Sequence, residues 1–311
     1  MQLFESLDLP RRFPNPVLTI GNYDGVHVGH RTIIDIVTLK AREIAGTSML
    51  MTFHPHPLQI LRPDKELPSI TPIQEKRRLI EETGIEVLLM VPFSEEFSQV
   101  SPESFVKEIL IGKLGIKGLV VGYDFRFGRG GRGDIEGMRK YAASHGFFLE
   151  VVDAVTIGGE KVGSNRIRKL LQLGEVEHAN LLLGRPYMIS GEVVQGKGRG
   201  RTFGFPTINL KTDFNLIPPN GIYISQVEYQ GKKLPSVTNI GHSPTFGVQE
   251  RTIETFILDY DGDLYGQATR LFLRRRIREE VRFNDVSELR AQIERDVAAT
   301  REYFAGQATS G

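Results

Sequence analysis

Short apolar runs alternate with amphipathic stretches through the first half of the chain, from Val17 to Val155. This alternation predicts strands and helices that stack into a parallel sheet with helices on both faces. In the first helical stretch Ile33, Val37 and Ala41 recur at helical spacing, so one face can pack on the sheet. The predicted strands are Val17–Gly21, Ser48–Phe53, Glu86–Val91, Gly118–Gly122 and Phe147–Val152, and the predicted helices are Thr32–Ile44, Gln74–Thr83, Pro102–Leu114 and Ile135–His145.

The pattern changes after Gly163, where two short helical stretches surround Gly174 and helical spacing then disappears. Turn residues such as Gln230-Gly231 and Asp261-Gly262 separate the apolar runs that follow, which is typical of an antiparallel barrel or sandwich. These runs are Tyr187–Val194, Gly221–Tyr229, Lys233–Ile240, Thr252–Tyr260 and Ala268–Leu273.

A last amphipathic stretch, Val286–Phe304, predicts a C-terminal helix that caps the barrel. We therefore predict two domains with a boundary at Gly184. Residues 1–184 form an α/β doubly wound, Rossmann-like domain, and residues 185–311 form an antiparallel β-barrel domain with a C-terminal helix. The length of 311 residues agrees with two domains.

The composition excludes several classes of protein. With no cysteine, the chain can form no disulfide, thiolate nucleophile or cysteine-ligated metal site. The 39 basic and 38 acidic residues leave a net charge of +1, so no bulk charge draws the chain to nucleic acid or to anionic membranes. The chain has no apolar run of membrane-spanning length, and its first residues do not form a secretory signal, so we expect a cytoplasmic protein.

A glycine-rich segment, Gly21–His30, follows the first predicted strand, where open parallel sheets bind nucleotides. Gly21 and Gly29 let backbone amides approach a phosphate at the start of the next helix. His27 and His30 can both face one ligand and stabilise charge on a pyrophosphate leaving group, so the pattern predicts nucleotidyl transfer. Asp24 belongs to the same predicted nucleotide site. Zinc bound by these histidines together with His54 and His56 is the alternative.

Two further segments carry groups suited to a triphosphate. After the fourth predicted strand, Asp124 can contact base or ribose and Arg126 can contact phosphate. Ser164 and Arg168 open a later helix, where a hydroxyl, helix amides and a guanidinium can meet the same phosphates. The alternative for both segments is a solvated loop and an ordinary helix start.

In the second half, the segment Gly196–Leu210 begins with glycines and basic residues, including Gly200 and Arg201, that can cover nucleotide phosphates. Thr207 and Asn209 alternate along an extended stretch and offer two oxygens to a hard cation such as magnesium. Glu254 lies in an apolar strand and can accept a proton from an alcohol that attacks the γ-phosphate of ATP. For Thr207, Asn209 and Glu254 the alternative interpretation is an outward polar position on a surface strand.

Together the HxGH pair, the GYDFRFG segment, the Ser/Arg helix start and the PTIN segment resemble the bacterial bifunctional riboflavin kinase/FAD synthetases, from Val17 to Phe304. The resemblance implies a nucleotidyltransferase-like first domain that converts FMN to FAD and a barrel that phosphorylates riboflavin, each with ATP and Mg²⁺. It implies that ATP lies against His27 and His30, and that Ser164 and Arg168 belong to a second phosphate motif. In the barrel it implies that Thr207 and Asn209 bind magnesium and phosphate and that Glu254 is the base.

The chain departs from the family pattern at Gly163, Asn165, His54 and Ile208. Two alternatives therefore stay open: a riboflavin kinase with a weakened adenylyltransferase half, and a flavin- or nucleotide-binding module without turnover. We expect small-molecule partners and no nucleic acid, because acidic residues dilute the basic stretch Leu273–Arg282. The sequence leaves open whether copies of the chain associate.

Overall fold

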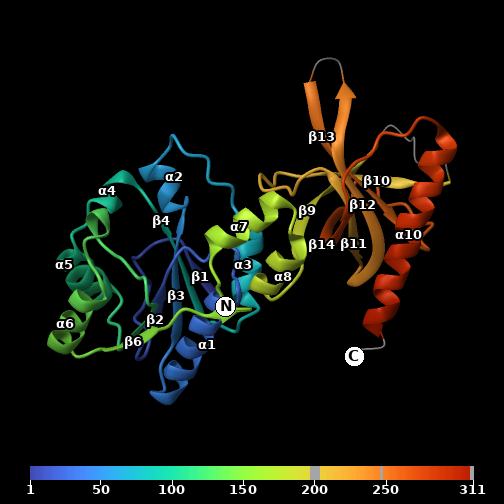
Figure 1. Cartoon of the computed structure of the whole chain (residues 1–311). Coiled ribbons are helices and arrows are strands. Elements are labelled where there is room, and N and C mark those ends of the chain that lie inside the picture. The colour runs from blue at the N-terminus through green and yellow to red at the C-terminus, as the bar shows by residue number, and fades with distance from the viewer. Residues whose placement is uncertain (197–203, 246–247, 309–311) are drawn as a thin grey trace. The chain divides into compact units, whose positions relative to one another are not determined.

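The computed structural model describes residues 1–196, 204–245 and 248–308. The chain divides into two compact units, Met1–Ser164 and Asn165–Gly311. Figure 1 shows helices on both sides of a sheet in the first unit, and a curved sheet with one long helix in the second.

The first unit contains a six-stranded sheet in which every neighbouring pair is parallel, in the order β1-β4-β3-β2-β5-β6. The five predicted strands are all present, and the structure adds β1 at the N-terminus. The strands are β1 (Gln2–Phe4), β2 (Val17–Ile20), β3 (Ser48–His54), β4 (Val87–Pro92), β5 (Gly118–Gly122) and β6 (Phe148–Val152).

Both faces of this sheet are covered. On one face Ile34 and Val37 of α1 (Val28–Glu43) and Leu79 of α3 (Ile73–Glu81) pack on buried strand residues. On the other face a π-helix at Phe105–Lys113 and α6 (Ile135–His145) form the second core. Shorter elements of this unit are α2 (Pro57–Leu61), α4 (Glu95–Ser98), α5 (Pro102–Ser104), a 3₁₀ turn at Arg129–Gly131, β7 (Thr156–Ile157) and β8 (Glu160–Lys161).

The strand order reverses between β2 and β5. From β2 the chain proceeds to β3 on one side, whereas β5, which also pairs with β2, leads to β6 on the other. In open α/β sheets such a reversal leaves a crevice at the carboxyl ends of the two strands, and this is where ligands bind. The segments after β2 and β5 are the two glycine-containing segments that the sequence analysis selected.

The second unit begins earlier than the predicted boundary at Gly184. Helices α7 (Ser164–Leu173) and α8 (Val176–Leu183) belong almost wholly to it, because α8 packs on β14 (Ala268–Arg278) and β9 (Tyr187–Val194) of the barrel. The Asn180 side chain on α8 also donates a hydrogen bond to the carbonyl of Leu273, at 2.9 Å. The amphipathic pattern of these helices does not reveal which unit they cover.

The barrel is closed, with the antiparallel order β10-β13-β12-β11-β14-β9 and a final pairing between β9 and β10. The predicted turn at Gln230-Gly231 joins β11 to β12, and both residues have positive φ, as a tight hairpin requires. The remaining elements are β10 (Thr207–Lys211), β11 (Gly221–Tyr229), β12 (Lys232–Thr245), β13 (Val248–Ile257) and α10 (Val286–Ala308), the predicted C-terminal helix.

Successive residues of each barrel strand face opposite sides. The buried hydroxyls of Ser225, Ser236, Thr238 and Thr255 hydrogen-bond with one another at 2.7–2.9 Å. The alternate positions, which include Ile222 and Val237, pack with Val297 of α10. The side covered by α10 therefore differs in chemistry from the hydroxyl-lined side.

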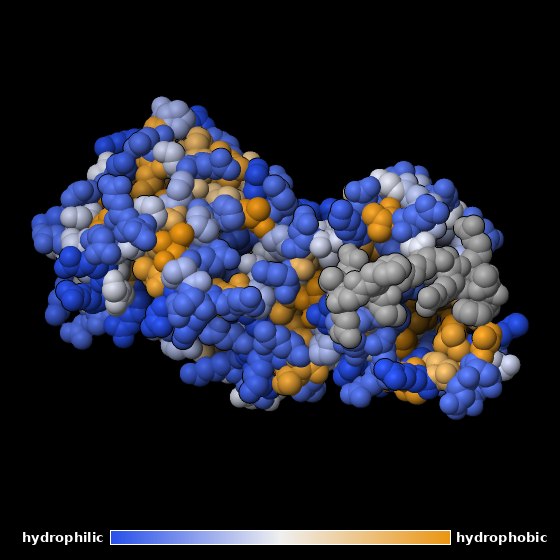
Figure 2. All heavy atoms as spheres, turned by 90° about the horizontal axis from the view of Figure 1, so that it is seen from above, coloured by the Kyte–Doolittle hydropathy of each residue, from blue (hydrophilic) through white to orange (hydrophobic). Residues whose placement is uncertain are grey.

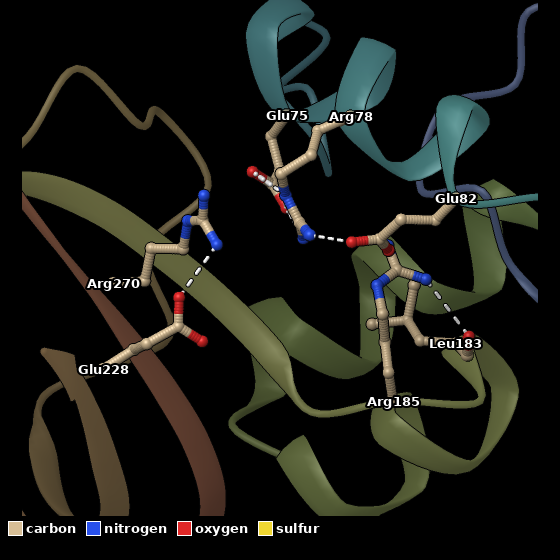
Figure 3. Close-up of polar contacts among 7 residues, drawn as sticks. All are labelled: Glu75, Arg78, Glu82, Leu183, Arg185, Glu228 and Arg270. Carbon is tan, nitrogen blue, oxygen red and sulfur yellow. Dashed lines mark hydrogen bonds and ion pairs between the residues drawn. The ribbon is translucent and has the colours of Figure 1, made fainter. Parts of the chain in front are cut away.

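Figure 3 shows charged pairs in each unit. In the first unit Arg78 lies between Glu75 and Glu82 on α3. In the barrel Glu228 of β11 and Arg270 of β14 are cross-strand partners with a 2.9 Å ion pair. These partly exposed pairs contribute about 1 kcal/mol or less each, which makes Glu228 a suitable control carboxylate below.

Candidate functional sites

The paired histidines lie where β2 leads into α1. His27 is the N-cap of α1, and its Nδ1 accepts a hydrogen bond from the backbone amide of His30 at 3.2 Å. The two rings stack with centroids 3.5 Å apart and planes 14° apart. Because Nδ1 is the acceptor, a neutral His27 carries its proton on Nε2 and presents a donor there.

The turn before the histidines has an unusual backbone. Tyr23, Gly25 and Val26 all have positive φ, which is strained for the two residues other than glycine. Tyr23 is buried, its hydroxyl lies 2.6 Å from the Thr19 hydroxyl, and burial raises its pKa. The Tyr23 ring packs against Gly21, where a Cβ would lie 3.1 Å from the ring. A side chain at position 21 would therefore press on the Tyr23 ring, whatever the role of Gly21 toward a nucleotide.

Asp24 fastens the turn to a neighbouring segment. Its carboxylate oxygens accept hydrogen bonds from the amides of Ile70 and Thr71, both at 3.1 Å. The Gly25 amide donates to the Thr71 hydroxyl at 2.8 Å. In this structure the carboxylate predicted to bind nucleotide is buried and faces backbone amides, so Asp24 shapes the turn. Its contact with a nucleotide stays a prediction.

A buried lysine supports the same turn. Lys76 of α3 donates to the carbonyl of Asn22 at 3.1 Å, and Thr52 at the end of β3 donates to that carbonyl at 3.0 Å. Burial lowers the pKa of Lys76, and the nearby Asp24 charge opposes this shift. Side chains from β3 and α3 therefore fix the turn that carries the histidines.

Ser164 is brought to this turn, because its hydroxyl donates to the carbonyl of Asp24 at 2.9 Å. Arg168 follows one turn later on α7 and is buried, with its guanidinium donating to the Asn165 side chain at 2.6 Å. Asn165, where the chain departs from the family pattern, thus accepts a hydrogen bond that orients the Arg168 guanidinium. At Gly163, the other departure here, a Cβ would meet no atom within 4 Å.

The segment after β5 places Asp124 and Arg126 at the surface, on the strand next to β2. The Arg126 guanidinium lies 3.7 Å from the carboxylate of Asp134, the N-cap residue of α6. Asp124 approaches Gly122, where a Cβ would be 3.3 Å from its carboxylate oxygen and 3.7 Å from Ile33 of α1. Asp124 and the histidines therefore follow adjacent strands at the same edge of the sheet.

The second histidine pair has local partners. His56 is the N-cap of α2 and accepts a hydrogen bond from the Leu58 amide at 3.1 Å, while His54 ends β3 and is exposed. Within the described parts of the chain, no group of three or more His, Asp or Glu side chains is placed to hold a metal.

In the barrel, three polar residues form a row across adjacent strands. Asn209 of β10 lies opposite Glu254 of β13, and Glu254 lies opposite Asn239 of β12. Opposite residues of antiparallel strands share a face, with Cβ atoms about 5 Å apart. Thr207, two residues before Asn209, faces the same side. The residues predicted as metal ligands and base are thus neighbours on one side of the barrel.

Ile208 faces the other way. It lies opposite Thr255, a member of the hydroxyl-lined side. The extra bulk at this departure from the family pattern is therefore directed away from Thr207 and Asn209.

Glu254, Thr207 and Asn239 line a cavity of about 290 Å³ between the barrel and α10. The other walls are mainly apolar. Arg278 and Asp296, also in the wall, pair at 2.7 Å and so neutralise each other. The apolar lining residues are Phe205, Ile222, Val237, Phe256, Val281, Phe283, Leu289 and Ile293. Glu280, also in the wall, accepts a hydrogen bond from the Asn220 side chain at 2.9 Å. A largely apolar cavity with the Glu254 carboxylate in its wall suits a flat aromatic substrate that carries an alcohol.

Val281 and Phe283, which were not predicted from the sequence, also contribute to this wall. Both lie in the polar stretch Glu279–Asp285, and isolated apolar residues among polar ones were the available signal in the sequence.

The glycine-rich basic segment is only partly described. Gly200 and Arg201, which were predicted to cover phosphates, lie outside the described residues. Gly196, just before them, contacts the Asn209 side chain so closely that a Cβ at position 196 would overlap its amide group.

We therefore expect Gly196→Ala to displace the Asn209 amide and to lower phosphorylation in the barrel at least tenfold, as loss of a hydrogen bond to a charged group does. Steady-state phosphorylation over a range of magnesium concentrations measures this. Gly306→Ala is the control, because a Cβ there meets no atom within 4 Å and alanine favours a helix. Equal rates for Gly196→Ala and the unmodified chain would contradict the assignment of Asn209.

The basic stretch of β14 is occupied within the barrel. Arg274 donates to Gln226 at 3.0 Å, Arg276 donates to the Asn220 carbonyl at 2.7 Å, and Arg278 pairs with Asp296. Three arginines of this strand therefore have partners within the barrel unit. Among the described residues, no helix is long and apolar enough to cross a bilayer, and Figure 2 shows mostly hydrophilic residues on the face in view.

A parallel α/β unit with stacked histidines at its strand reversal and a closed barrel with a carboxylate in its cavity wall are typical of a nucleotide-dependent transferase with two units. A model of the FAD synthetase family matches residues 10–166, and a model of the riboflavin kinase family matches residues 183–304. The chain belongs to the family of bifunctional riboflavin kinase/FMN adenylyltransferases.

Relatives of this family resemble the chain over nearly its whole length. The bifunctional riboflavin kinase/FMN adenylyltransferase of Bacillus subtilis is 39% identical, with 93% of this chain and 92% of that protein covered. The Escherichia coli K12 protein of the same name has the same identity and coverage. A crystal structure described as a macrolide-efflux protein from Streptococcus pneumoniae has a TM-score of 0.87 and 30% identity, covering 96% of this chain and 98% of that one.

Proposed function

We propose that the chain phosphorylates riboflavin to FMN in its barrel and adenylylates FMN to FAD in its parallel-sheet unit. Each reaction consumes one ATP, and the second releases pyrophosphate. The observation that carries the proposal is the placement of Glu254 directly opposite Asn209, at the edge of an apolar cavity, in a chain whose other unit carries stacked histidines at its strand reversal.

In the barrel, Glu254 accepts the proton of the riboflavin 5′-hydroxyl as its oxygen attacks the γ-phosphate of ATP, which leaves ADP. The apolar cavity holds the ring system and excludes water. The carboxylate lies within one strand spacing of Asn209. The alcohol and the phosphate can therefore be held by neighbouring strands of one rigid barrel, which supplies the alignment that phosphoryl transfer depends on.

In the parallel-sheet unit, the phosphate of FMN is already an anionic nucleophile, so it needs no base to attack the α-phosphate of ATP. Charge grows on the departing pyrophosphate instead. In this proposal His27 and His30, whose rings stack at the start of α1, stabilise this charge together with the amides of that helix. Ser164, Arg168, Asp124 and Arg126 complete the proposed nucleotide site.

Magnesium is the metal that we assign to the barrel site. The Thr207 hydroxyl and the Asn209 amide oxygen are hard oxygen donors on the same face, and Glu254 lies opposite Asn209. A magnesium ion retains several waters and needs only one or two such protein ligands, so this donor set fits it. The metal would neutralise charge on the ATP phosphates.

We assign adenylylation to residues 1–184 and phosphorylation to residues 185–311. We also propose that the protein is located in the cytoplasm. Ser164 and Arg168, which we assign to the nucleotide of the first reaction, fall within the first of these two ranges.

The test is a product assay with riboflavin and ATP, in which we expect FMN followed by FAD when magnesium is present. Without magnesium, both products should fall by at least a hundredfold, because the phosphate charge is then not neutralised. Chromatography separates the flavins. A reaction that stops at FMN would support the alternative with a weakened adenylyltransferase, and absence of any turnover would support a binding module.

A further inference from the structure

The polar row of the barrel contains one residue to which the proposed reaction gives no role. Asn239 lies opposite Glu254 on the strand away from Asn209 and lines the same cavity. Its Oδ1 atom is buried and accepts no hydrogen bond within the described parts of the chain. A buried acceptor without a donor destabilises the fold, so such an atom in a cavity wall points to a donor that arrives with the substrate.

The row continues to Ile222 of β11, which lies opposite Asn239. From β10 to β11 the wall therefore presents Asn209, Glu254, Asn239 and Ile222 in this order. Neighbouring strands are about 4.8 Å apart, so residues on successive strands can meet successive parts of a substrate chain that lies across them. The wall thus changes from phosphate-binding oxygens to a base, then to a neutral acceptor, then to an apolar side chain.

Riboflavin changes in the same order, from the 5′-hydroxyl that reacts, through the other hydroxyls of the ribityl chain, to the apolar ring system. We propose that the Asn239 carbonyl oxygen accepts a hydrogen bond from an inner hydroxyl of the ribityl chain and so makes the barrel selective for a polyol side chain. This inference rests on the proposed kinase reaction and adds a specificity-determining residue to it.

The selectivity follows from the neutral amide. With riboflavin bound, the inner hydroxyl donates to Oδ1 and the acceptor is satisfied. With a flavin that keeps the terminal hydroxyl and has a plain hydrocarbon chain before it, Oδ1 stays buried without a donor. A site built to bond a substrate hydroxyl discriminates against the analogue that lacks it for this reason.

The experiment compares riboflavin with a flavin that carries a 5-hydroxypentyl side chain, in the full-length protein with MgATP. For the unmodified chain we expect kcat/KM to be at least tenfold higher with riboflavin. Asn239→Ala should lower kcat/KM for riboflavin about tenfold and change that for the hydroxypentyl flavin less than twofold. Asn239→Ser, whose hydroxyl can accept a hydrogen bond, should recover part of the selectivity.

Two further measurements keep the result decisive. FAD formation from supplied FMN should be unchanged in both variants, and the thermal midpoint of Asn239→Ala should not fall without substrate, because the removed acceptor has no donor in the free protein. An equal loss for both flavins would overturn the inference, since Asn239 would then act on Glu254 or on the fold. Absence of FMN formation by the unmodified chain would instead refute the kinase function.

Discussion

Glu254→Gln is expected to lower the conversion of riboflavin to FMN by about 10²–10⁴-fold, the range typical of losing a general base. The glutamine side chain has the same shape and cannot take a proton from the 5′-hydroxyl. FAD formation from supplied FMN should continue at the unmodified rate, because the proposed adenylylation site uses none of the barrel residues. Separate initial-rate assays of the two reactions measure both effects.

Glu228→Gln is the matched control, because Glu228 is also a barrel carboxylate on a strand, but it pairs with Arg270 at the surface (Figure 3). Loss of this partly exposed pair should cost about 1 kcal/mol of stability or less and leave both activities intact. If Glu254→Gln retained the phosphorylation rate of Glu228→Gln, Glu254 would not be the base.

Replacing both stacked histidines should lower FAD formation from FMN and leave FMN formation from riboflavin unchanged. His27 also caps α1, and loss of an N-cap costs about 1 kcal/mol. The informative variant is therefore His27→Asn with His30→Ala, because asparagine can still accept the hydrogen bond from the amide of residue 30. We expect adenylylation of FMN to fall by about 10²–10³-fold or more, as it does when donors that stabilise transition-state charge are removed.

Riboflavin phosphorylation is the internal control for this double variant and should be unchanged. His145→Ala, which removes an exposed imidazole from the last turn of α6 in the same unit, should leave pyrophosphate release unaffected. Substantial FAD formation by the double variant would show that the histidines only cap and pack the first helix.

The periodicity of the sequence predicted the order of elements well, because the apolar strands of the parallel sheet are buried on both faces and bounded by turns. Val17–Ile20 and Ser48–His54 begin where predicted for this reason. The short strand Gln2–Phe4 was missed, since three residues of low burial at a sheet edge carry no pattern. The predicted helix Pro102–Leu114 is mostly a π-helix, in which Phe105, Val106, Ile109 and Leu110 are buried at intervals that also fit an α-helix.

The sequence also predicted some features of the candidate sites and not others. Alternation along the strand placed Thr207 and Asn209 on one face, and the register that brings Glu254 opposite Asn209 depends on pairing between distant segments. For Asp24 the local pattern was less informative. Its position in a glycine-rich turn suggested a ligand contact, whereas its carboxylate accepts hydrogen bonds from the amides of Ile70 and Thr71. No local pattern reveals a partner so far along the chain.

Closure of the barrel fixes the position of Glu254, the proposed base. Every barrel strand pairs on both sides, so β13 cannot slide by one residue without breaking two ladders. Such a slide would replace the Glu254 carboxylate by the Thr255 hydroxyl or the Ile253 side chain, which belong to the opposite side. During evolution we therefore expect insertions and deletions to be tolerated in the connecting loops. We expect loss of one codon within β13 to abolish the proposed phosphorylation.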